Sequence, residues 1–187
     1  IKGSIIMKKI RVYLRAFEPE DYLLLHKWRN DDDIAHYFSG TIRFTSTLNE
    51  KKWLEEKIFD KNNVNCAICI KETNEFIGCI FLNNIDYINR SAHCPTFIGA
   101  KEHWNKGYAT EARILMLKHG FYVKGLERIF DYVHEDNIGS LKMHEKCGYK
   151  REGLLRRASY VDGEFKNLVV LSVLREEFEE ILKDYEF

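Results

Sequence analysis

Residues 103–112 of the chain read HWNKGYATEA, and this stretch decides the fold. A short apolar run at residues 97–100 comes just before it. A helical pattern follows, in which one face carries Ala112, Leu115, Met116 and His119. We therefore expect a strand, a turn of small residues and a helix in immediate succession.

The start of this helix has the features of an anion site. The first N–H groups of a helix have no partner within it, and the positive end of the helix dipole lies there. Gly107 and Ala109 let a phosphate approach the backbone, and Lys106 adds a positive charge at the rim. Ordinary strand-to-helix joints have a similar composition, so the turn alone leaves both interpretations open.

Residues 128–149 form a second informative stretch and read RIFDYVHEDNIGSLKMHEKCGY. The alternation over Arg128–Val133 predicts a strand. Asn137 is then suited to cap a short helix, and Gly148 is suited to end it.

Taken in this order, the two stretches resemble the GCN5-related N-acetyltransferase (GNAT) superfamily. Its acetyl-CoA loop runs Gln/Arg-x-x-Gly-x-Gly/Ala, and residues 104–109 here read WNKGYA. Its later motif runs Asn-x-x-Ala/Ser-x-x-apolar-Tyr-x-x-x-Gly-Phe, which is matched here by Asn137, Ser140, Met143, His144, Gly148 and Tyr149. The resemblance is nearest to the branch of ribosomal-protein N-terminal and spermidine acetyltransferases.

Size and charge narrow the function further. The chain has 187 residues, of which 45% are hydrophobic, enough for one globular domain with a buried core. Lys plus Arg equal Asp plus Glu at 29 each, so no overall field favours nucleic acid or an anionic membrane. We expect a small-molecule or peptide amine as the partner.

The cysteines and the apolar runs indicate the cellular compartment, and the remaining sequence indicates the domain bounds. Five cysteines, an odd number, lie mostly in apolar runs, which indicates buried thiols in a reducing cytoplasm and no metal site. No apolar run approaches the roughly 20 residues of a membrane span. We expect residues 1–6 to be an expression remnant or disordered, and residues 7–187 to be a single domain with a helical tail at 174–187.

The remaining segments predict a mixed α/β fold. Strands are expected at 10–15, 65–70, 76–82, 92–100, 128–133, 149–161 and 165–174. Helices are expected at 19–30, at 46–60, from the turn at Trp104 to about residue 124, from residue 138 to the glycine stop at Gly148, and at 174–185. Asp162-Gly163 is a strong hairpin signal between the last two strands. This order gives antiparallel hairpins and one βαβ crossover.

The resemblance implies a central mixed, mostly antiparallel sheet flanked by helices, splayed between its fourth and fifth strands. Those strands would be 92–100 and 128–133, and their separation would admit the pantetheine arm of acetyl-CoA. Pro95 fits a strand that leaves its neighbour, because proline cannot donate to a central ladder.

The resemblance also implies which residues bind the cofactor. The backbone of Phe97 and Ile98 would pair with the pantetheine arm. The remaining cofactor contacts would come from Trp104, Asn105, Lys106, Gly107, Tyr108, Ala109, Thr110, Asn137, Ser140 and Lys146. Asn137 is equally explained as a plain helix cap.

Three residues are candidates for proton transfer during direct attack of the amine in a ternary complex. His144 occupies the position of the family's tyrosine acid and could protonate the leaving thiolate; alternatively it is an ordinary helical histidine, and water is the acid. His93 lies where relatives carry a glutamate and could accept the amine proton through a water, or could merely pack beside the slot. Asp86 is a further candidate base.

The acceptor stays open at this stage. A polyamine, another small amine or a protein N-terminus fits an N-acetyltransferase of this branch. A cationic acceptor would be attracted by the acidic residues Asp31–Asp33, Glu50, Glu55 and Glu56. A catalytically silent acyl-CoA-binding domain is the alternative, kept open by the two histidine substitutions. A homodimer is compatible with the resemblance.

Overall fold

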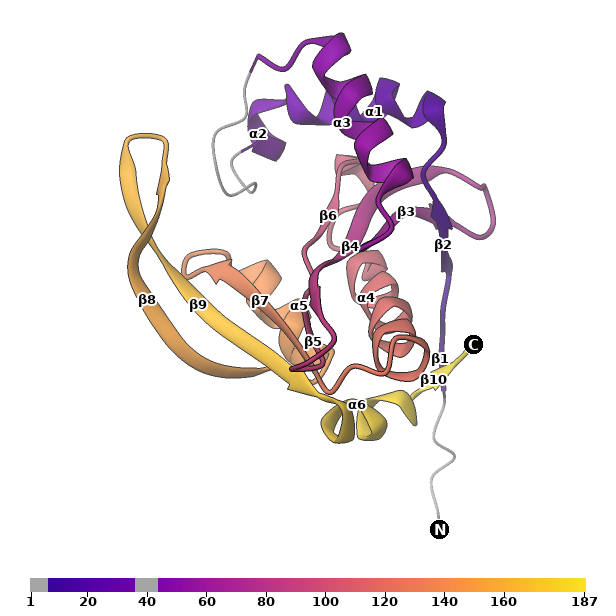
Figure 1. The fold of residues 1–187 in the computed structure, drawn as a ribbon, viewed down its shortest axis with the longest axis vertical. Helices are drawn as coiled ribbons and strands as arrows, with labels where there is room; N and C mark the ends of the chain where they lie inside the picture. The colour runs from indigo at the N-terminus through magenta and orange to yellow at the C-terminus, as the bar shows by residue number, and fades with distance from the viewer. Residues whose placement is uncertain (1–6, 36–43) are drawn as a thin grey trace.

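The computed structural model describes residues 7–35 and 44–187 (Figure 1). The six N-terminal residues, expected from the sequence to be a remnant, lie outside this described part. No helix in the described part is long and apolar enough to cross a membrane.

The centre of the molecule is a sheet of eight strands within the described residues, in the order β2-β3-β4-β5-β7-β9-β8, with β6 also paired to β4. All pairs are antiparallel except β5 with β7. The strands are β2 (Val12–Ala16), β3 (Val64–Ile70), β4 (Phe76–Asp86), β5 (Ser91–His93), β6 (Thr96–Ile98), β7 (Arg128–His134), β8 (Lys150–Val161) and β9 (Glu164–Leu174). This is the mixed, mostly antiparallel α/β fold that the sequence predicts.

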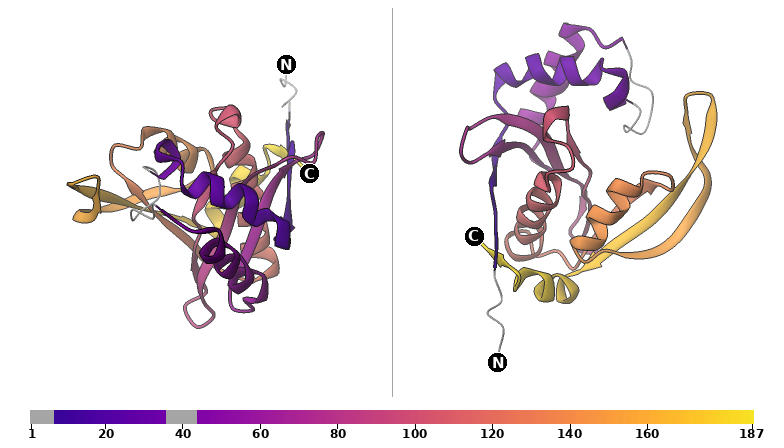
Figure 2. Two further views of the ribbon diagram at one scale, coloured as in Figure 1. Left: turned by 90° about the horizontal axis from the view of Figure 1, so that it is seen from above. Right: turned by 180° about the vertical axis from the view of Figure 1, so that it is seen from behind.

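The helices form separate groups around the sheet (Figures 1 and 2). At one end lie η1 (Pro19–Asp21), α1 (Tyr22–Arg29), α2 (Asp32–Ala35) and α3 (Thr47–Phe59). The sheet's central region is covered by η2 (Lys101–His103), α4 (Tyr108–Lys118), its π-helical continuation (His119–Val123) and α5 (Ile138–Lys146). The chain closes with α6 (Arg175–Leu182) and with β10 (Tyr185–Glu186), which pairs in parallel with β1 (Lys8–Lys9).

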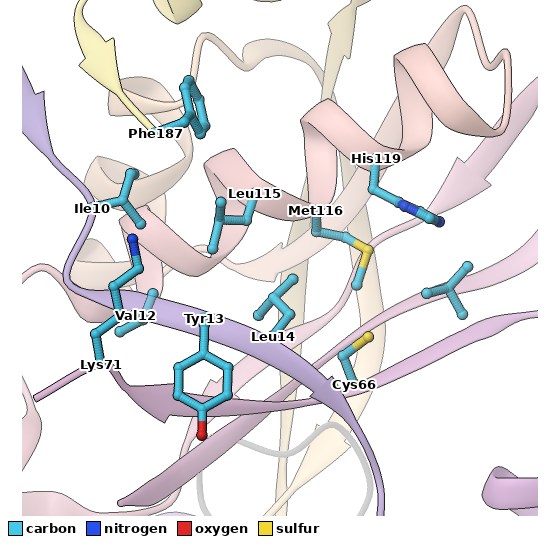
Figure 3. A pocket seen from close by; sticks show the side chains of 11 residues that line it. Ile10, Val12, Tyr13, Leu14, Cys66, Lys71, Leu115, Met116, His119 and Phe187 are labelled. Carbon is cyan, nitrogen blue, oxygen red and sulfur yellow. The ribbon is translucent and has the colours of Figure 1, made fainter. Parts of the chain in front are cut away.

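Helix α4 packs against the sheet through a buried apolar face. Ala112, Met116 and Leu117 are at most 1% exposed, which confirms an apolar face. Figure 3 shows Leu115 facing β2 across a cavity of about 380 Å³ that also reaches the C-terminal Phe187. This cavity lies away from the turn that precedes α4, because no residue of that turn lines it.

Several element boundaries differ from those predicted. Strand β4 continues to Asp86, beyond its predicted end at residue 82. Residues 32–35 form the short helix α2, where the sequence predicts no element, and the tail helix predicted to reach residue 185 ends at Leu182. The hairpin prediction is confirmed, since Asp162 and Gly163 have φ of 49° and 87°, the pair of positive values that a tight two-residue turn requires.

The predicted strand 92–100 is divided into β5 and β6 at Cys94 and Pro95. Strand β5 pairs with β7 up to His93, and the Cys94 N–H donates to the Phe130 carbonyl at 3.0 Å. Beyond that point β6 pairs only with β4 among the described residues. The sheet therefore splays where the sequence predicts, between Thr96–Ile98 of β6 and Asp131–Val133 of β7, an opening that we call the fork.

Candidate active site

Local chemistry on both strands explains why pairing stops at the fork. On one side Pro95 follows the last residue bonded to β7, and its carbonyl faces β4, where it accepts from the Phe81 N–H at 3.1 Å. On the other side, the Tyr132 N–H donates at 2.8 Å to Oδ1 of Asp131, the residue before it. Because the backbone after Cys94 is bonded to β4 and the Tyr132 N–H is already occupied, the ladder between the two strands ends here.

Arg113 of α4 bridges the two arms of the fork. Its Nη2 donates to Thr96 Oγ1 on β6 at 2.9 Å and to Asp131 Oδ2 on β7 at 3.0 Å. Its Nη1 donates to the Tyr149 hydroxyl at 3.1 Å, while its Nε is buried without a partner. The side chain is only 1% exposed, so a full positive charge is buried between the strands.

The carboxylate of Asp131 lies at the base of the fork and receives two donors on each oxygen. Oδ1 accepts from the Tyr132 N–H at 2.8 Å and contacts His93 Nε2 at 2.9 Å. Oδ2 accepts from Arg113 and contacts His144 Nε2 at 3.0 Å. Burial alone would raise the pKa of Asp131, but the bonds to His144 and His93 and the charge of Arg113 hold it well below its ordinary value.

His93 approaches this carboxylate from the face of the sheet that carries Phe130 and Tyr132, which we call the open face. Its ring stacks on Phe130 at 5.6 Å with an interplanar angle of 22° and lies 5.6 Å from the Tyr132 ring. Its side chain is 24% exposed. A partly exposed imidazole therefore stands at the base of the fork, as a candidate base requires.

His144 approaches the same carboxylate from α5, on the opposite, helix-covered face, and is 1% exposed. Nδ1 lies 2.8 Å from the carbonyl of Ser140, one helical turn earlier, and 3.4 Å from the Ser140 hydroxyl. Burial and the charge of Arg113 lower the pKa of His144. Both ring nitrogens thus face protein groups, and the two histidines expected to act separately share Asp131.

Asp86, the remaining candidate base, is held in a local turn. It accepts from the backbone N–H groups of Ile88 and Asn89 at 2.9 and 2.8 Å and from Asn89 Nδ2 at 2.7 Å. These bonds, chiefly those from Asn89, lower the pKa of Asp86. A carboxylate stabilised in its ionised form is a poor base.

The turn at residues 104–110 leads into α4 and leaves the first N–H groups of that helix without acceptors in the described part of the chain. Asn105 and Gly107 have φ of 60° and 88°, which direct the chain sharply into α4. The Glu111 N–H is the first of the helix to reach a carbonyl, that of Gly107. Within the described part of the chain, the N–H groups of residues 108–110 have no acceptor. A Cβ at Gly107 would meet only Arg11 Nη2, at 3.4 Å, so the turn is not covered.

Arg11 adds a positive charge to this turn that the sequence did not indicate. Its Nη2 donates to the Lys106 carbonyl at 2.6 Å, and its guanidinium lies 4.6 Å from the centre of the Tyr108 ring. Glu111, 7% exposed, accepts from the Arg11 backbone N–H at 2.7 Å and from its Nε at 2.8 Å. The two residues are 100 positions apart, so no local pattern could have paired them.

The other expected cofactor residues lie around the same opening. Phe97 and Ile98 pair with β4 on one side, and Trp104 Nε1 donates to the Ile98 carbonyl at 2.8 Å. Asn137 caps α5 by accepting from the Ser140 N–H at 3.0 Å. Lys146 is the last residue of α5 and is exposed. The cap interpretation of Asn137 is confirmed, and a second role in binding is compatible with it.

These features together fit a ligand with a diphosphate and a long thiol-bearing arm. Free N–H groups at a helix start, with Arg11 and Lys106 beside them, suit a diphosphate. The fork separates β6 from β7 among the described strands, which suits an extended arm lying between them. The residues present therefore match the chemistry of acetyl-CoA.

Comparison with known proteins agrees with this geometry. The family model described as acetyltransferase (GNAT) domain matches residues 11–150. The chain is 29% identical over 171 residues to an uncharacterised N-acetyltransferase, p20, of Bacillus licheniformis, covering 90% of this chain and 95% of that protein. It is 27% identical over 169 residues to spermidine N(1)-acetyltransferase of Vibrio cholerae, covering 88% and 94%.

Solved structures show the same similarity. The crystal structure of spermidine N-acetyltransferase from Vibrio cholerae in complex with CoA and spermine superposes with a TM-score of 0.83. It is 25% identical in sequence, and the match covers 90% of this chain and 98% of that one.

Proposed function

The chain belongs to the GNAT acetyltransferase family, and we propose that this acetyl-CoA-dependent N-acetyltransferase acts on a primary amine of a polyamine. The observation that carries the proposal is the fork beside the start of α4, where β6 and β7 part within the described sheet and an open anion site adjoins them. The relatives named spermidine acetyltransferases support the acceptor class.

Acetyl-CoA supplies an acetyl group activated as a thioester, and the chain's residues would hold it in three places. Backbone N–H groups of the 104–110 turn, with Arg11 and Lys106, would bind the diphosphate. The β6 edge at Phe97 and Ile98 would hold the arm, and the start of α5 at Asn137 and Ser140 would enclose its other side. Lys146 would contribute charge from the end of α5.

The amine nitrogen would attack the thioester carbonyl directly, forming the N–C bond as the C–S bond breaks. An acyl-enzyme is disfavoured because the cysteine nearest the fork is unsuited to be a nucleophile. Cys94 is fully buried, and this burial raises its pKa to about 11. Cys147 has a pKa raised to about 12 for the same reason, so both thiols stay protonated near neutral pH.

A cationic acceptor suits the open face. Phe130 and Tyr132 present aromatic rings beside His93, and Tyr132 is 44% exposed. Aromatic faces attract ammonium groups, by about 0.5–1 kcal/mol at exposed sites. Of the acidic residues expected to attract the acceptor, Asp31 and Asp33 pair with Lys101 and Glu50 pairs with Arg29. Glu55 and Glu56 are exposed on α3.

Release of free thiol from acetyl-CoA in the presence of an amine panel tests the proposal, with acetylated products identified by mass. We expect turnover with spermidine and spermine to exceed turnover with peptide N-termini and amino sugars. Turnover confined to peptides would reassign the acceptor. Thermal protection by acetyl-CoA without thiol release for any amine would favour the silent binding domain instead.

We also propose that copies of the chain associate, with a homodimer as the smallest assembly. The β8–β9 hairpin extends from the body as an arm with exposed apolar side chains, at Leu154, Leu155, Tyr160 and Phe165 (Figure 1). Light scattering measures the assembly, and a monomer at micromolar concentration would refute this proposal.

A cytoplasmic location is proposed from the cysteines. All five are free, and Cys69, Cys79, Cys94 and Cys147 are buried. Unpaired thiols are typical of a reducing compartment. Fractionation of cells that express the full-length protein would test this location.

A further inference from the structure

We propose that Asp131 is a positioning residue that acts through His93, fixing its ring so that Nδ1 accepts a proton from the acceptor amine. This inference rests on the proposed function and assigns the proton route of the same reaction.

The first argument is the saturation of the Asp131 carboxylate. Each oxygen contacts two nitrogens, from Tyr132 and His93 on Oδ1 and from Arg113 and His144 on Oδ2. A carboxylate that stays ionised can only accept, so His93 must donate through Nε2–H. A neutral His93 ring then has its lone pair on Nδ1.

The second argument is the position of Nδ1. It has no hydrogen-bond partner in the described part of the chain, and it is not among the buried unpartnered atoms, so it remains open to solvent or ligand. Stacking on Phe130 and contact with Tyr132 restrict rotation of the ring. The acceptor nitrogen of the ring is therefore held at the base of the fork, on the open face.

Asn83 gives a third, independent observation at the same place. It lies directly opposite His93 in the β4–β5 pair, so the two side chains leave the same face with Cβ atoms roughly 4.5–5.5 Å apart. Its Oδ1 is buried and has no partner. An amine placed between them could donate one hydrogen to Asn83 Oδ1 while His93 Nδ1 takes another.

The charged groups around Asp131 explain how it can keep this role. Arg113 faces it from α4, and His144 faces it from α5, where Tyr149 follows the helix and also contacts Arg113. The buried Arg113 charge is balanced by the Asp131 charge. Protonation of His93 then places a positive ring beside a carboxylate that already has its full set of donors.

The proton transfer balances as follows. As the amine nitrogen forms its bond to the acetyl carbon, its N–H bond breaks and an Nδ1–H bond forms on His93. The C–S electron pair leaves with sulfur, which takes a proton from water. His93 later returns its proton to water, so the net products are an acetylated amine and a free thiol.

Four proteins test the inference: wild type, Asp131→Asn, His93→Ala and the double variant, assayed with acetyl-CoA and spermidine over a pH range. We expect each single variant to lower kcat by roughly 100-fold, within the range of general-base effects. The double variant should lose little more than His93→Ala alone, because Asp131 acts through that ring. Losses that multiply in the double variant would overturn the inference.

The pH profile gives a readout that a purely structural role would not change. In Asp131→Asn the protonated ring loses its counter-charge, so the acidic limb of the kcat/KM profile should move down by about one pH unit. Glu50→Gln is the matched control, because it breaks another buried carboxylate–arginine pair and should leave the limb in place. An unmoved limb in Asp131→Asn would contradict the inference.

Folding and function failures remain distinguishable in this design. Thermal protection by acetyl-CoA reports whether the fork of each variant is intact. If Asp131→Asn does not fold, ring ¹⁵N shifts of wild-type His93, assigned through His93→Ala, decide: an Nε2–H tautomer above pH 7 supports the inference, and an Nδ1–H tautomer overturns it. Absence of thiol release by wild type would instead refute the proposed function.

Discussion

Arg113 is the residue on which the shape of the fork most depends. Its guanidinium joins Thr96 on one arm to Asp131 on the other while it is 1% exposed. Burying two charges costs several kcal/mol per ion, which only good geometry offsets. The pair therefore fixes the separation of the strands more than it adds to stability.

Arg113→Leu should expose that dependence. It leaves the Asp131 charge buried without its partner, so we expect a loss of about 3–5 kcal/mol in the free energy of unfolding, measured in urea. The double variant Arg113→Leu/Asp131→Leu should recover part of this loss, since no unpaired charge remains. If Arg113→Leu is as stable as wild type, the fold does not depend on the pair of Arg113 and Asp131.

The role of His144 can be tested by a substitution that distinguishes a general acid from a side chain with only a structural role. His144→Gln keeps a side-chain donor near Asp131 but removes the titratable proton. Because both ring nitrogens face protein groups, we expect this variant to keep kcat within about threefold of wild type, less than the loss of general acid catalysis would cause. A loss of roughly 100-fold with unchanged affinity for acetyl-CoA would restore the acid role of His144.

At the scale of single elements, the turn before α4 depends on one glycine. Gly107 has φ of 88°, and beyond its own backbone the space around it is open. Gly107→Glu would place a negative side chain at the anion site, so acetyl-CoA should no longer raise the melting temperature of this variant. Gly107→Ala should lose about 1–2 kcal/mol of stability through strain and keep most of the protection.

Gly163→Ala supplies the matched control for that pair. The φ of Gly163 is 87°, and no atom lies within 4 Å of the added Cβ. Gly163→Ala should therefore cause the same backbone strain as Gly107→Ala, at a position away from the anion site. Full protection by acetyl-CoA is expected in Gly163→Ala. Retained protection in Gly107→Glu would place the diphosphate elsewhere.

Glu152 of β8 makes a pH-sensitive contact with the neighbouring strands β7 and β9. Glu152 accepts two bonds from Arg128 at 2.6 Å and one from the Ser172 hydroxyl at 2.7 Å, and these lower its pKa to about 2 from the usual 4.5. A depressed carboxylate pKa adds stability above about pH 4.5, and this stability is lost as the pH falls through about 2.

Thermal unfolding of Glu152→Gln across pH 2–7 checks this contact. The variant should melt below wild type at pH 6–7, and the two curves should converge as the pH approaches 2. Because the Glu152 side chain is 40% exposed, the difference should be modest and should shrink in high salt. A constant difference at all pH values would contradict the assignment.

For the molecule as a whole, the sequence predicted what depends on local chemistry. Gly107, Pro95 and the Asp162-Gly163 pair impose backbone geometry through their own covalent structure, and each marks a turn or a break in the structure. The motifs at 104–109 and 137–149 placed the helix starts correctly. The order of elements then followed with only small errors of boundary.

The sequence did not reveal the charges that meet across the fold. Arg113 lies in an apolar helical face and Asp131 in an alternating strand, positions where a pattern predicts core or surface and gives no partner. Their contact exists only once α4 is packed on the sheet. The same is true of Arg11 and Glu111, so tertiary structure was needed to find both clusters.

The central claim is that acetyl-CoA occupies the 104–110 turn and the fork together. Amide hydrogen exchange with and without acetyl-CoA, followed by mass spectrometry of peptides, tests it most directly. We predict slower exchange in peptides that cover residues 105–111 and 96–99, together with 131–134, and little change over the β8–β9 arm. Slower exchange confined to other segments, or unchanged exchange at both the turn and the fork, would contradict the claim.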